Sequence, residues 1–230
     1  MSDSKEVLRQ KVLDLLPAPI SKIEVQKKRK HRYSVFVNNT FVVGISEHTL
    51  VSLNISKGTE LTPSILDKIT ESENYHFAKH YILDLLGRRS HSKSELLSKS
   101  LRKGYHKDQL NDIIDELELK GYVNDQTFAL AFTRDKLNAG KWGSTKIKTS
   151  LVQKGISSSI IKECQQLIEQ EQDVSDFLIQ TVQKNKRKFQ RVEDLSKRKA
   201  KLYAFLLQRG VPSSHIHTHL NDLLLLIKTS

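Results

Sequence analysis

The residues of this chain that are best suited to chemistry are a glycine-lysine segment, three alternating histidines and two clusters of lysine and arginine. The segment Gly140-Lys-Trp-Gly-Ser144 could cradle a phosphate with its backbone and its lysine. A nucleotide-binding loop, however, needs four residues between its glycines and a strand before them. Because this segment lacks that spacing and lies between expected helices, we interpret it as an interhelical turn, in which Trp142 either packs or binds a ligand.

The alternating histidines are His215, His217 and His219. His215 and His219 lie one helical turn apart and could hold a metal ion between them. Because no cysteine and no evident third carboxylate ligand accompany them, a pair of surface histidines is the favoured interpretation. Acidic pairs such as Asp115-Glu116 occupy ordinary exposed helix positions. The sequence therefore predicts no catalytic residue, no metal site and no cofactor, and we do not expect an enzyme.

Lysine and arginine are concentrated in two segments. Residues 22–32 contain six of them and residues 184–201 contain nine, and these segments account for the whole formal net charge of +12. Concentrated positive charge attracts a polyanion more strongly than diffuse charge does. A polyanionic partner is therefore predicted, and the alternative is a solvated surface that keeps the protein soluble. Four aromatic residues near these charges either stack on bases or belong to the core: Tyr33, Phe36, Phe189 and Tyr203.

Length and composition favour a mainly helical protein. The chain has 230 residues, of which 37% are hydrophobic, and Cys164 is its only cysteine. A single cysteine cannot form a disulfide within the chain, which favours a reducing compartment, and Cys164 is expected to be buried and inert. Residues 1–16 lack the apolar stretch of a secretory signal, and no segment is long enough to cross a membrane. We expect a cytoplasmic monomer that does not contact membranes.

Residues 1–70 are expected to form a small α+β module. Alternating β-branched and aromatic residues flank Asn38-Asn39, and this pattern predicts a β-hairpin. A further strand is expected at residues 23–25, so that the basic residues 27–32 would connect the first two strands. Thr62 and Pro63 are expected to be the N-cap and the first residue of a helix.

The rest of the chain carries an internal repeat, marked by three glycines that end helices: Gly104, Gly155 and Gly210. When the sequence is aligned on these glycines, three apolar positions coincide in every repeat. They are Leu96, Ile147 and Leu202 before the glycine, Leu110, Ile161 and Ile216 after it, and Leu117, Ile168 and Leu223 further on. The spacing fits three short helices in each repeat. Such tandem repeats predict an elongated array, which suits a long partner.

The fold class predicted is mainly α, with tandem three-helix repeats preceded by the small α+β module. The repeats are expected at residues 71–122, 123–171 and 172–230, the last with a basic insertion. Ser92 and Glu95 form a capping-box pattern, and the third repeat is expected to begin near Val174 with a long basic helix through Lys188. The other expected helix N-caps are Asp125, Ser144 and Ser157.

Residues 121–156 resemble the central signature of the RecX family of recombination regulators. The matching segments are Gly121-Tyr-Val-Asn-Asp125-x-x-Phe128-Ala129-x-x-Phe132 and Lys141-Trp-Gly143-x-x-Lys146-Ile147-x-x-x-Leu151-x-x-Lys154-Gly155-Ile156. Upstream, Arg88-Arg89-x-His91-Ser92-x-x-Glu95-Leu96 with Lys103-Gly104 is similar to the first repeat of that family. Two further segments resemble the N-terminal extension of some members: Ile23-Glu-Val-Gln-Lys27 and Phe41-Val-Val-Gly44-Ile-Ser46. The likeness covers residues 20–225 and is weakest in the third repeat, which has Arg209-Gly210 where the family has Lys-Gly.

This resemblance implies a non-enzymatic regulator of homologous recombination and DNA repair in the SOS response. Such a protein binds the RecA–DNA filament and modulates the ATPase and strand exchange of RecA, with inhibition as the expected direction. The implied partners are the RecA filament and single-stranded DNA, with duplex DNA as a further candidate. The expected nucleic-acid or filament contacts are Lys27, Lys28, Arg29, Lys30, Arg32, Arg88, Arg89, Lys141, Lys146, Lys184, Lys186, Arg187, Lys188, Lys197 and Arg198.

A second function stays open from the residues alone. Three short helices around a glycine turn also describe a helix-turn-helix, so the alternative is a DNA-binding transcription regulator.

Overall fold

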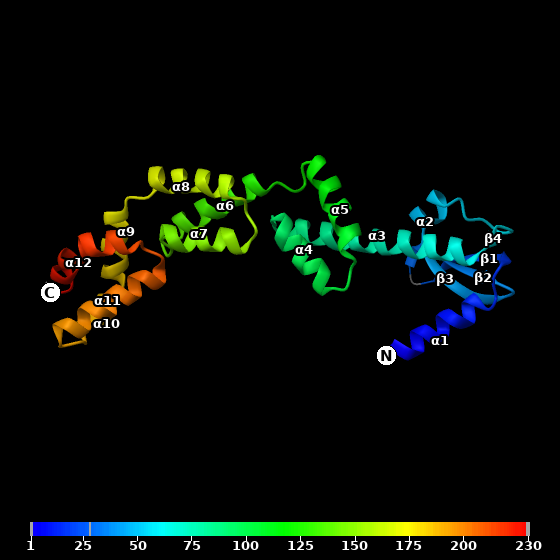
Figure 1. The fold of residues 1–230 in the computed structure, drawn as a ribbon, viewed down its shortest axis with the longest axis horizontal. Helices are drawn as coiled ribbons and strands as arrows, with labels where there is room; N and C mark the ends of the chain where they lie inside the picture. Colours follow the sequence, from blue (N-terminus) through cyan, green and yellow to red (C-terminus); the bar gives the residue numbers. More distant parts are fainter. Residues whose placement is uncertain (1, 28, 229–230) are drawn as a thin grey trace. The chain divides into compact units, whose positions relative to one another are not determined.

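The computed structural model describes residues 2–27 and 29–228. The elements are α1 (Ser2–Leu13), β1 (Ala18–Gln26), β2 (Arg29–Val37), β3 (Thr40–Ser46), α2 (Glu47–Ser52), β4 (Glu60–Leu61), α3 (Pro63–Arg88), α4 (Lys93–Arg102), α5 (Lys107–Leu119), α6 (Asp125–Asn138), α7 (Ser144–Gln153), α8 (Ser158–Glu171), α9 (Val174–Lys184), α10 (Lys186–Gln190), α11 (Leu195–Arg209) and α12 (Ser213–Lys228) (Figure 1). The fold is mainly helical with a small antiparallel sheet near the N-terminus, which confirms the predicted fold class.

The chain divides into two compact units. The first unit comprises Met1–Leu83 and Gly104–Ile113, and the second comprises Asp84–Lys103 and Ile114–Ser230. The first unit contains the sheet, and the second contains α4 and all helices from α6 onward.

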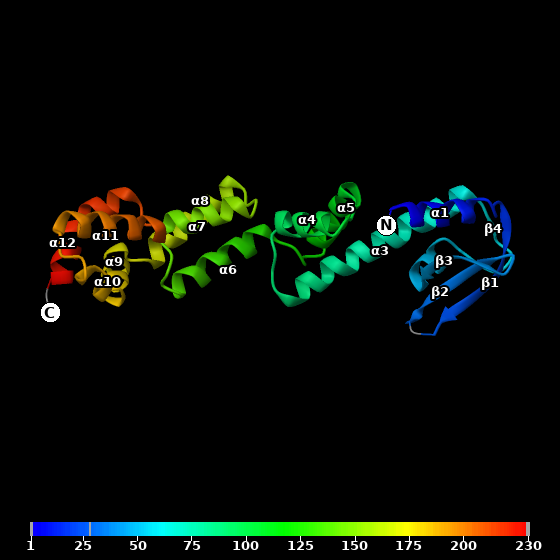
Figure 2. The ribbon, with the colours of Figure 1, turned by 90° about the horizontal axis from the view of Figure 1, so that it is seen from below.

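The first unit is built on a four-stranded antiparallel sheet in the order β3-β2-β1-β4 (Figure 2). Val35 and Ile45 of the sheet are fully buried in one hydrophobic cluster with Ile69 of α3. Asn38 and Asn39 have φ angles of 49° and 60°, which a tight turn between β2 and β3 requires. The predicted hairpin is therefore confirmed.

The basic segment at residues 27–32 lies mostly within a strand, which corrects the expectation that it connects two strands. β1 ends at Gln26 and β2 begins at Arg29, because the ladder between them continues as far as this pair. Lys28 lies outside the described residues.

Helix α3 begins as predicted and is longer than predicted. The hydroxyl of Thr62 accepts a hydrogen bond from the amide of Ile65 at 3.2 Å, as an N-cap does. The helix then continues through residue 70, where the sequence suggested a boundary, and ends at Arg88. Residues 71–74, Glu-Ser-Glu-Asn, contain neither glycine nor proline, so nothing in them stops a helix.

The repeat signature corresponds to buried positions and helix ends. All nine coincident apolar residues have exposed fractions of 6% or less. Gly104, Gly155 and Gly210 have φ angles of 97°, 72° and 86°, the left-handed conformation that ends a helix. The glycines therefore end helices as predicted, and the coincident apolar positions face the cores. We call α6–α8 the second repeat and α9–α12 the third.

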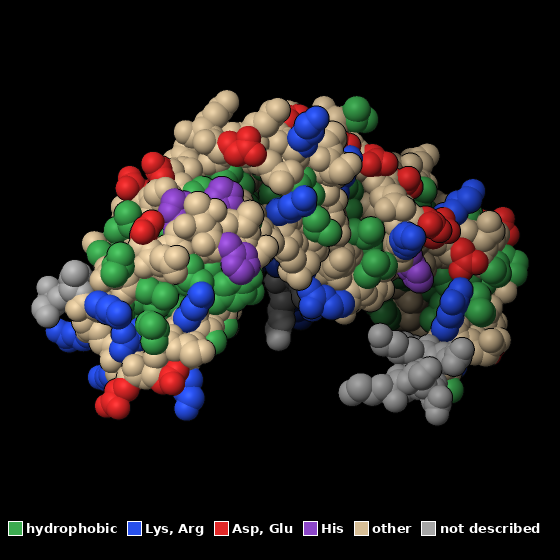
Figure 3. All heavy atoms as spheres, turned by 60° about the vertical axis from the view of Figure 1, so that its left-hand side comes forward, with side chains coloured by type: hydrophobic (Ala, Val, Ile, Leu, Met, Phe, Trp, Pro, Cys, Tyr) green, Lys and Arg blue, Asp and Glu red, His purple; other side chains and the backbone are tan. Residues whose placement is uncertain are grey.

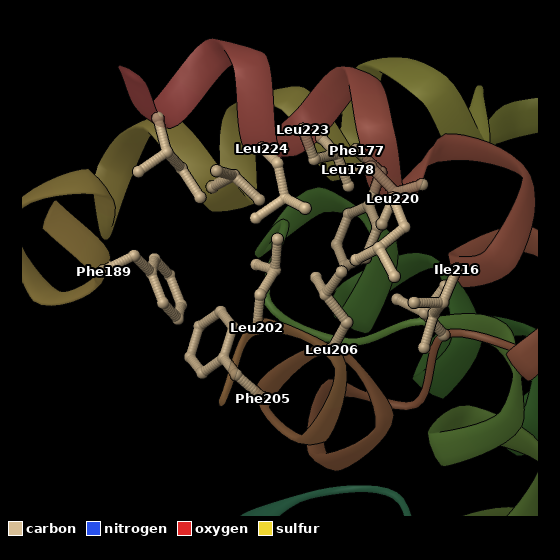
Figure 4. Close-up of a cluster of buried hydrophobic side chains, with 13 residues drawn as sticks. Phe177, Leu178, Phe189, Leu202, Phe205, Leu206, Ile216, Leu220, Leu223 and Leu224 are labelled. Atoms are coloured by element: carbon tan, nitrogen blue, oxygen red, sulfur yellow. The ribbon is translucent and has the colours of Figure 1, made fainter. Parts of the chain in front are cut away.

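The third repeat has its own hydrophobic core, formed by side chains from α9, α10, α11 and α12 (Figure 4). The rings of Phe189 and Phe205 meet edge to face, with centroids 5.3 Å apart. Phe189 has no exposed surface, so it belongs to the core and cannot stack on bases. Cys164 is likewise buried, in the core of the second repeat, as predicted.

Two helix N-caps in the repeats differ from the expectation. The N-cap of α6 is Asn124 rather than Asp125, because the Asn124 side chain accepts from the amide of Thr127 at 2.9 Å. The N-cap of α7 is Gly143 rather than Ser144.

The long basic helix expected through Lys188 is broken into two helices at Asn185. The Asn185 side-chain amide donates to the carbonyl oxygen of Thr181 at 2.8 Å and so competes with the next helical hydrogen bond. Helix α9 therefore ends at Lys184, and α10 begins at Lys186.

Candidate nucleic-acid interface

In each repeat, the helix that the repeat glycine ends and the helix that follows it carry different charges. We call the former the second helices (α4, α7 and α11) and the latter the third helices (α5, α8 and α12). The second helices α4, α7 and α11 contain three, two and five Lys or Arg residues, and Glu95 is their only acidic residue. The third helices α5 and α8 each contain one Lys, against five and three acidic residues. Helix α12 carries one charge of each sign. A polyanion is therefore attracted to the second helices and repelled by α5 and α8.

Within the second unit, the second helices of successive repeats meet end to end. At the first junction, the hydroxyl of Ser92 at the start of α4 donates to the carbonyl oxygen of Lys154 at the end of α7, at 2.7 Å. At the second junction, the amide of Gly143 at the start of α7 donates to the carbonyl oxygen of Arg209 at the end of α11, also at 2.7 Å. Donors at the start of one helix thus form hydrogen bonds with carbonyl oxygens that the end of another helix leaves unpaired. This contact explains why α7 needs no side-chain cap.

A partly buried carboxylate pairs with two cations at the first junction. The Glu95 carboxylate accepts from Lys154 Nζ at 2.5 Å and from Arg89 Nη1 at 3.1 Å, and its side chain is 15% exposed. The Ser92 hydroxyl accepts from the Glu95 amide at 3.1 Å, which is the predicted half of the capping box. The Glu95 carboxylate pairs with Arg89 and Lys154 instead of with the Ser92 amide. Burial raises the pKa of Glu95, and the hydrogen bonds from Arg89 and Lys154 outweigh burial, so the pKa falls from 4.5 to about 2.

This ion pair gives the second unit a testable pH dependence. The folded pKa lies below the unfolded one, so the stabilisation is fully present above about pH 4.5 and is lost as the pH falls toward about 2. We expect Glu95→Gln to remove roughly 1–3 kcal/mol of pH-dependent stability. Urea unfolding of wild type and variant at pH 7, 4 and 3 measures the difference. Curves whose separation does not change with pH would contradict this assignment.

At the second junction, the described residues include no such carboxylate. Lys146 stands nine residues before its glycine, the position that Glu95 holds in the first repeat. The Lys146 ammonium lies 4.9 Å from the ring centre of Trp142, and Lys136 lies 5.1 Å from the same ring. Trp142 itself packs against Phe132 in the core of the second repeat. The junction is therefore cationic, with lysines held over aromatic rings.

Most of the predicted contact residues are exposed, whereas Arg32 and Arg198 bond to other groups of the protein. Arg32 is 17% exposed, forms an ion pair with Glu73 at 3.0 Å and donates to the carbonyl of Gly44. Arg198 Nε donates to the carbonyl of Val192 at 2.9 Å. Both cations thus hold the fold locally. The exposed predicted residues are Lys27, Arg88, Arg89, Lys141, Lys184, Arg187, Lys188 and Lys197, whereas Lys146 and Lys186 are half-buried. The side chains of Arg29 and Lys30, like Lys28, are outside the description.

Sequence reasoning overlooked three cations of this surface. Lys154 and Arg209 precede the glycines that end α7 and α11, and each reaches back to the preceding repeat. Lys136 lies over Trp142 and Phe132. The signal for the first two was the cation that stands before the glycine in every repeat; the signal for Lys136 is spatial only.

The surface is not uniformly positive. On the face drawn in Figure 3, Lys and Arg side chains are interspersed with acidic and hydrophobic ones. The sorting of charge by helix, rather than its density along the sequence, therefore defines the cationic surface.

Other chemistry finds no support among the described residues. No group of three or more His, Cys, Asp or Glu in residues 2–27 and 29–228 is placed to hold a metal ion. His217 Nε2 instead lies 3.4 Å from the hydroxyl of Tyr203. No helix in the same part of the chain is long and apolar enough to cross a membrane.

The fold defines a helical-repeat protein whose second helices are basic, and comparison with known proteins identifies relatives that share this fold. Residues 18–62 match the regulatory protein RecX N-terminal domain, and residues 124–164 match the second three-helix domain of RecX. A regulatory protein RecX from Clostridium tetani is 30% identical over 205 residues, which cover 89% of this chain and 94% of that protein. Another from Staphylococcus carnosus is 26% identical and covers 89% of this chain and 75% of its own length.

Solved structures agree with these matches. A crystal structure of regulatory protein RecX superimposes with a TM-score of 0.67 at 25% identity, over 89% of this chain and 99% of that one. RecX from Lactobacillus salivarius shares the fold with a TM-score of 0.56 at 21% identity, over 67% of this chain and 99% of that one. The chain belongs to the RecX family of regulatory proteins.

Proposed function

We propose that this chain regulates RecA by binding the RecA–DNA filament, and that it lowers the rates of ATP hydrolysis and strand exchange. The observation that carries the proposal is the row of basic second helices in the second unit, joined end to end at two junctions. Membership of a family of regulatory proteins supports a modulating role over a catalytic one. We propose a monomer that acts in the cytoplasm without a cofactor.

The physical basis is electrostatic. Lysine and arginine that neutralise phosphates release condensed counterions, which gives strong and salt-dependent binding without sequence preference. Several weak contacts on successive repeats add up through their high effective concentration. The exposed cations that we assign to these contacts lie on the second helices or on the segments that precede them along the chain: Lys141 before α7, Lys184, Arg187 and Lys188 on α9 and α10 before α11, and Lys197 on α11.

The helix-turn-helix alternative receives less support from the charges. In that motif the helix after the turn enters the major groove of duplex DNA. Here the corresponding helices α5 and α8 carry five and three acidic residues, which phosphates would repel.

The proposal is tested by titrating the purified full chain into RecA on single-stranded DNA at low salt and at physiological salt. We expect ATP hydrolysis and joint-molecule formation to fall as the ratio of this chain to RecA rises, with a weaker effect at the higher salt. Unchanged rates at every ratio and both salt concentrations would refute it. A footprint at one preferred duplex sequence would favour the transcription regulator instead.

A further inference from the structure

A hollow of about 370 Å³ opens at the second junction, between the second and third repeats. Helix α7 contributes Lys146, the break between α9 and α10 contributes Asn185, and α10 contributes Lys188. Helix α11 contributes the rest of the lining: Phe205, Gln208 and Arg209. The lining thus contains three cations, two amides and one aromatic ring, and no acidic residue.

The three cations of this hollow have no carboxylate partner in the part of the chain that the structure describes. Among the residues that the structure describes, no carboxylate lies within ion-pairing distance of Lys146, Lys188 or Arg209. At the equivalent place in the first junction, Glu95 pairs with Lys154. The second junction therefore has a lysine at the position where the first has an acid. An anion bound from solution would offset the positive charge there.

The donors in the hollow suit a phosphate group. Two ammonium groups, a guanidinium fork and two side-chain amides offer several N–H donors to tetrahedral oxygens. The Phe205 ring is only 8% exposed, and Lys188 and Arg209 lie over it at 4.8 Å and 5.1 Å, so no base can stack there. The hollow thus offers recognition of a phosphate without recognition of a base.

We propose that this hollow binds one phosphate group of a nucleic-acid backbone and thereby bridges the second and third repeats. This inference rests on the proposed function, because the phosphate is that of the DNA in the filament. Lys146 belongs to one repeat, whereas Lys188 and Arg209 belong to the next. A phosphate that contacts all three stabilises the folded junction, because unfolding would separate the three cations.

Trp142, the only tryptophan of the chain, supplies an intrinsic probe because the Lys146 ammonium lies over its ring. The full chain without RecA is titrated with oligothymidylate, with an abasic strand of equal length and with inorganic phosphate, while Trp142 emission is recorded. We expect both strands to change the emission at similar concentrations, and inorganic phosphate to do so only at concentrations at least about 100-fold higher, since it lacks neighbouring contacts.

Two variants and a matched control test the residues. Lys188→Gln removes one cation of the hollow, whereas Lys162→Gln removes an exposed cation of α8 that does not line it. For a labelled oligothymidylate at low salt, we expect Lys188→Gln to weaken binding about 5–10-fold and Lys162→Gln to weaken it less than twofold. Lys146→Glu gives the second junction an acid where the first has Glu95. A strand bound in the hollow should raise the unfolding temperature of the wild-type chain, and we expect no such rise in this variant although it remains folded.

Equal affinities for Lys188→Gln and Lys162→Gln, or a strand-induced rise in unfolding temperature that persists in Lys146→Glu, would overturn the proposal. A response to inorganic phosphate as strong as that to the strands would overturn the nucleic-acid source. Because RecA is absent, these results are separable from the proposed function. Inhibition of RecA that survives in both variants refutes the hollow alone, whereas normal strand binding without any effect on RecA refutes the regulation alone.

Discussion

Replacing Gly210 with alanine is expected to lower the free energy of unfolding by roughly 3–5 kcal/mol. Gly210 has a φ angle of 86°, which strains any other residue. A Cβ atom there would lie 2.2 Å from Lys146 Cβ and 2.5 Å from the Lys146 backbone nitrogen. Backbone atoms cannot move aside cheaply, so the start of α7 would separate from the end of α11. Urea unfolding followed by circular dichroism measures the loss.

Gly104→Ala is the matched control for this effect. Gly104 has the same left-handed conformation, with a φ angle of 97°, but a Cβ there would meet no described atom within 4 Å. We expect it to lose only the strain, roughly 1–2 kcal/mol. If the two variants lose equal stability, the end-to-end contact between α7 and α11 contributes nothing and the assigned junction is wrong.

Reversing two lysines of α11 is expected to have the largest effect on partner binding. Lys197 and Lys199 are both exposed on the most basic of the second helices. The double variant Lys197→Glu/Lys199→Glu should weaken binding to RecA–DNA filaments roughly 10–100-fold at low salt, because two attractive phosphate contacts become repulsive. Filament affinity at several salt concentrations measures this loss, and the salt dependence should become shallower by up to about 1.4.

The control reverses the same charges on the third helices. Lys107→Glu/Lys162→Glu changes one exposed lysine on α5 and one on α8, each among acidic neighbours. We expect less than a threefold loss of filament affinity from this double variant. Losses of equal size in both double variants would mean that net charge alone, and not its placement on the second helices, determines binding.

The sequence was sufficient for features that depend on local spacing. The nine coincident apolar residues could be predicted to be buried because helical periodicity relates neighbours only a few residues apart. Turn glycines such as Gly155 and the Asn38-Asn39 turn were predictable because a positive φ angle has a strong local residue preference. The capping hydroxyl of Ser92 follows from the same local chemistry.

Features that depend on contacts between distant segments were not predictable. Gly143 was not expected as an N-cap because its partner, the carbonyl of Arg209, lies in another repeat. Arg32 was predicted as a nucleic-acid contact because it ends a basic run, yet it lies against Glu73 of α3. Lysines in the sequence look alike, and only packing distinguishes one that neutralises a carboxylate from one that faces an open hollow.

The candidate surface shows the same division. Clustered charge in residues 184–201 indicated a polyanion partner, because charge density is read directly from composition. Lys146 occupies at the second junction the position that Glu95 occupies at the first. This difference was not predictable because the partners of both residues lie in other repeats.

We propose that cations on the second helices, and on the segments that precede them, bind the phosphates of a RecA–DNA filament. The most direct test measures affinity for RecA filaments on single-stranded DNA, for naked single strands and for naked duplex, each as a function of salt concentration. We expect the logarithm of the filament binding constant to fall linearly with the logarithm of the salt concentration, with a slope of about −0.7 for each phosphate contact. Filament binding that is tight and independent of salt would contradict the claim.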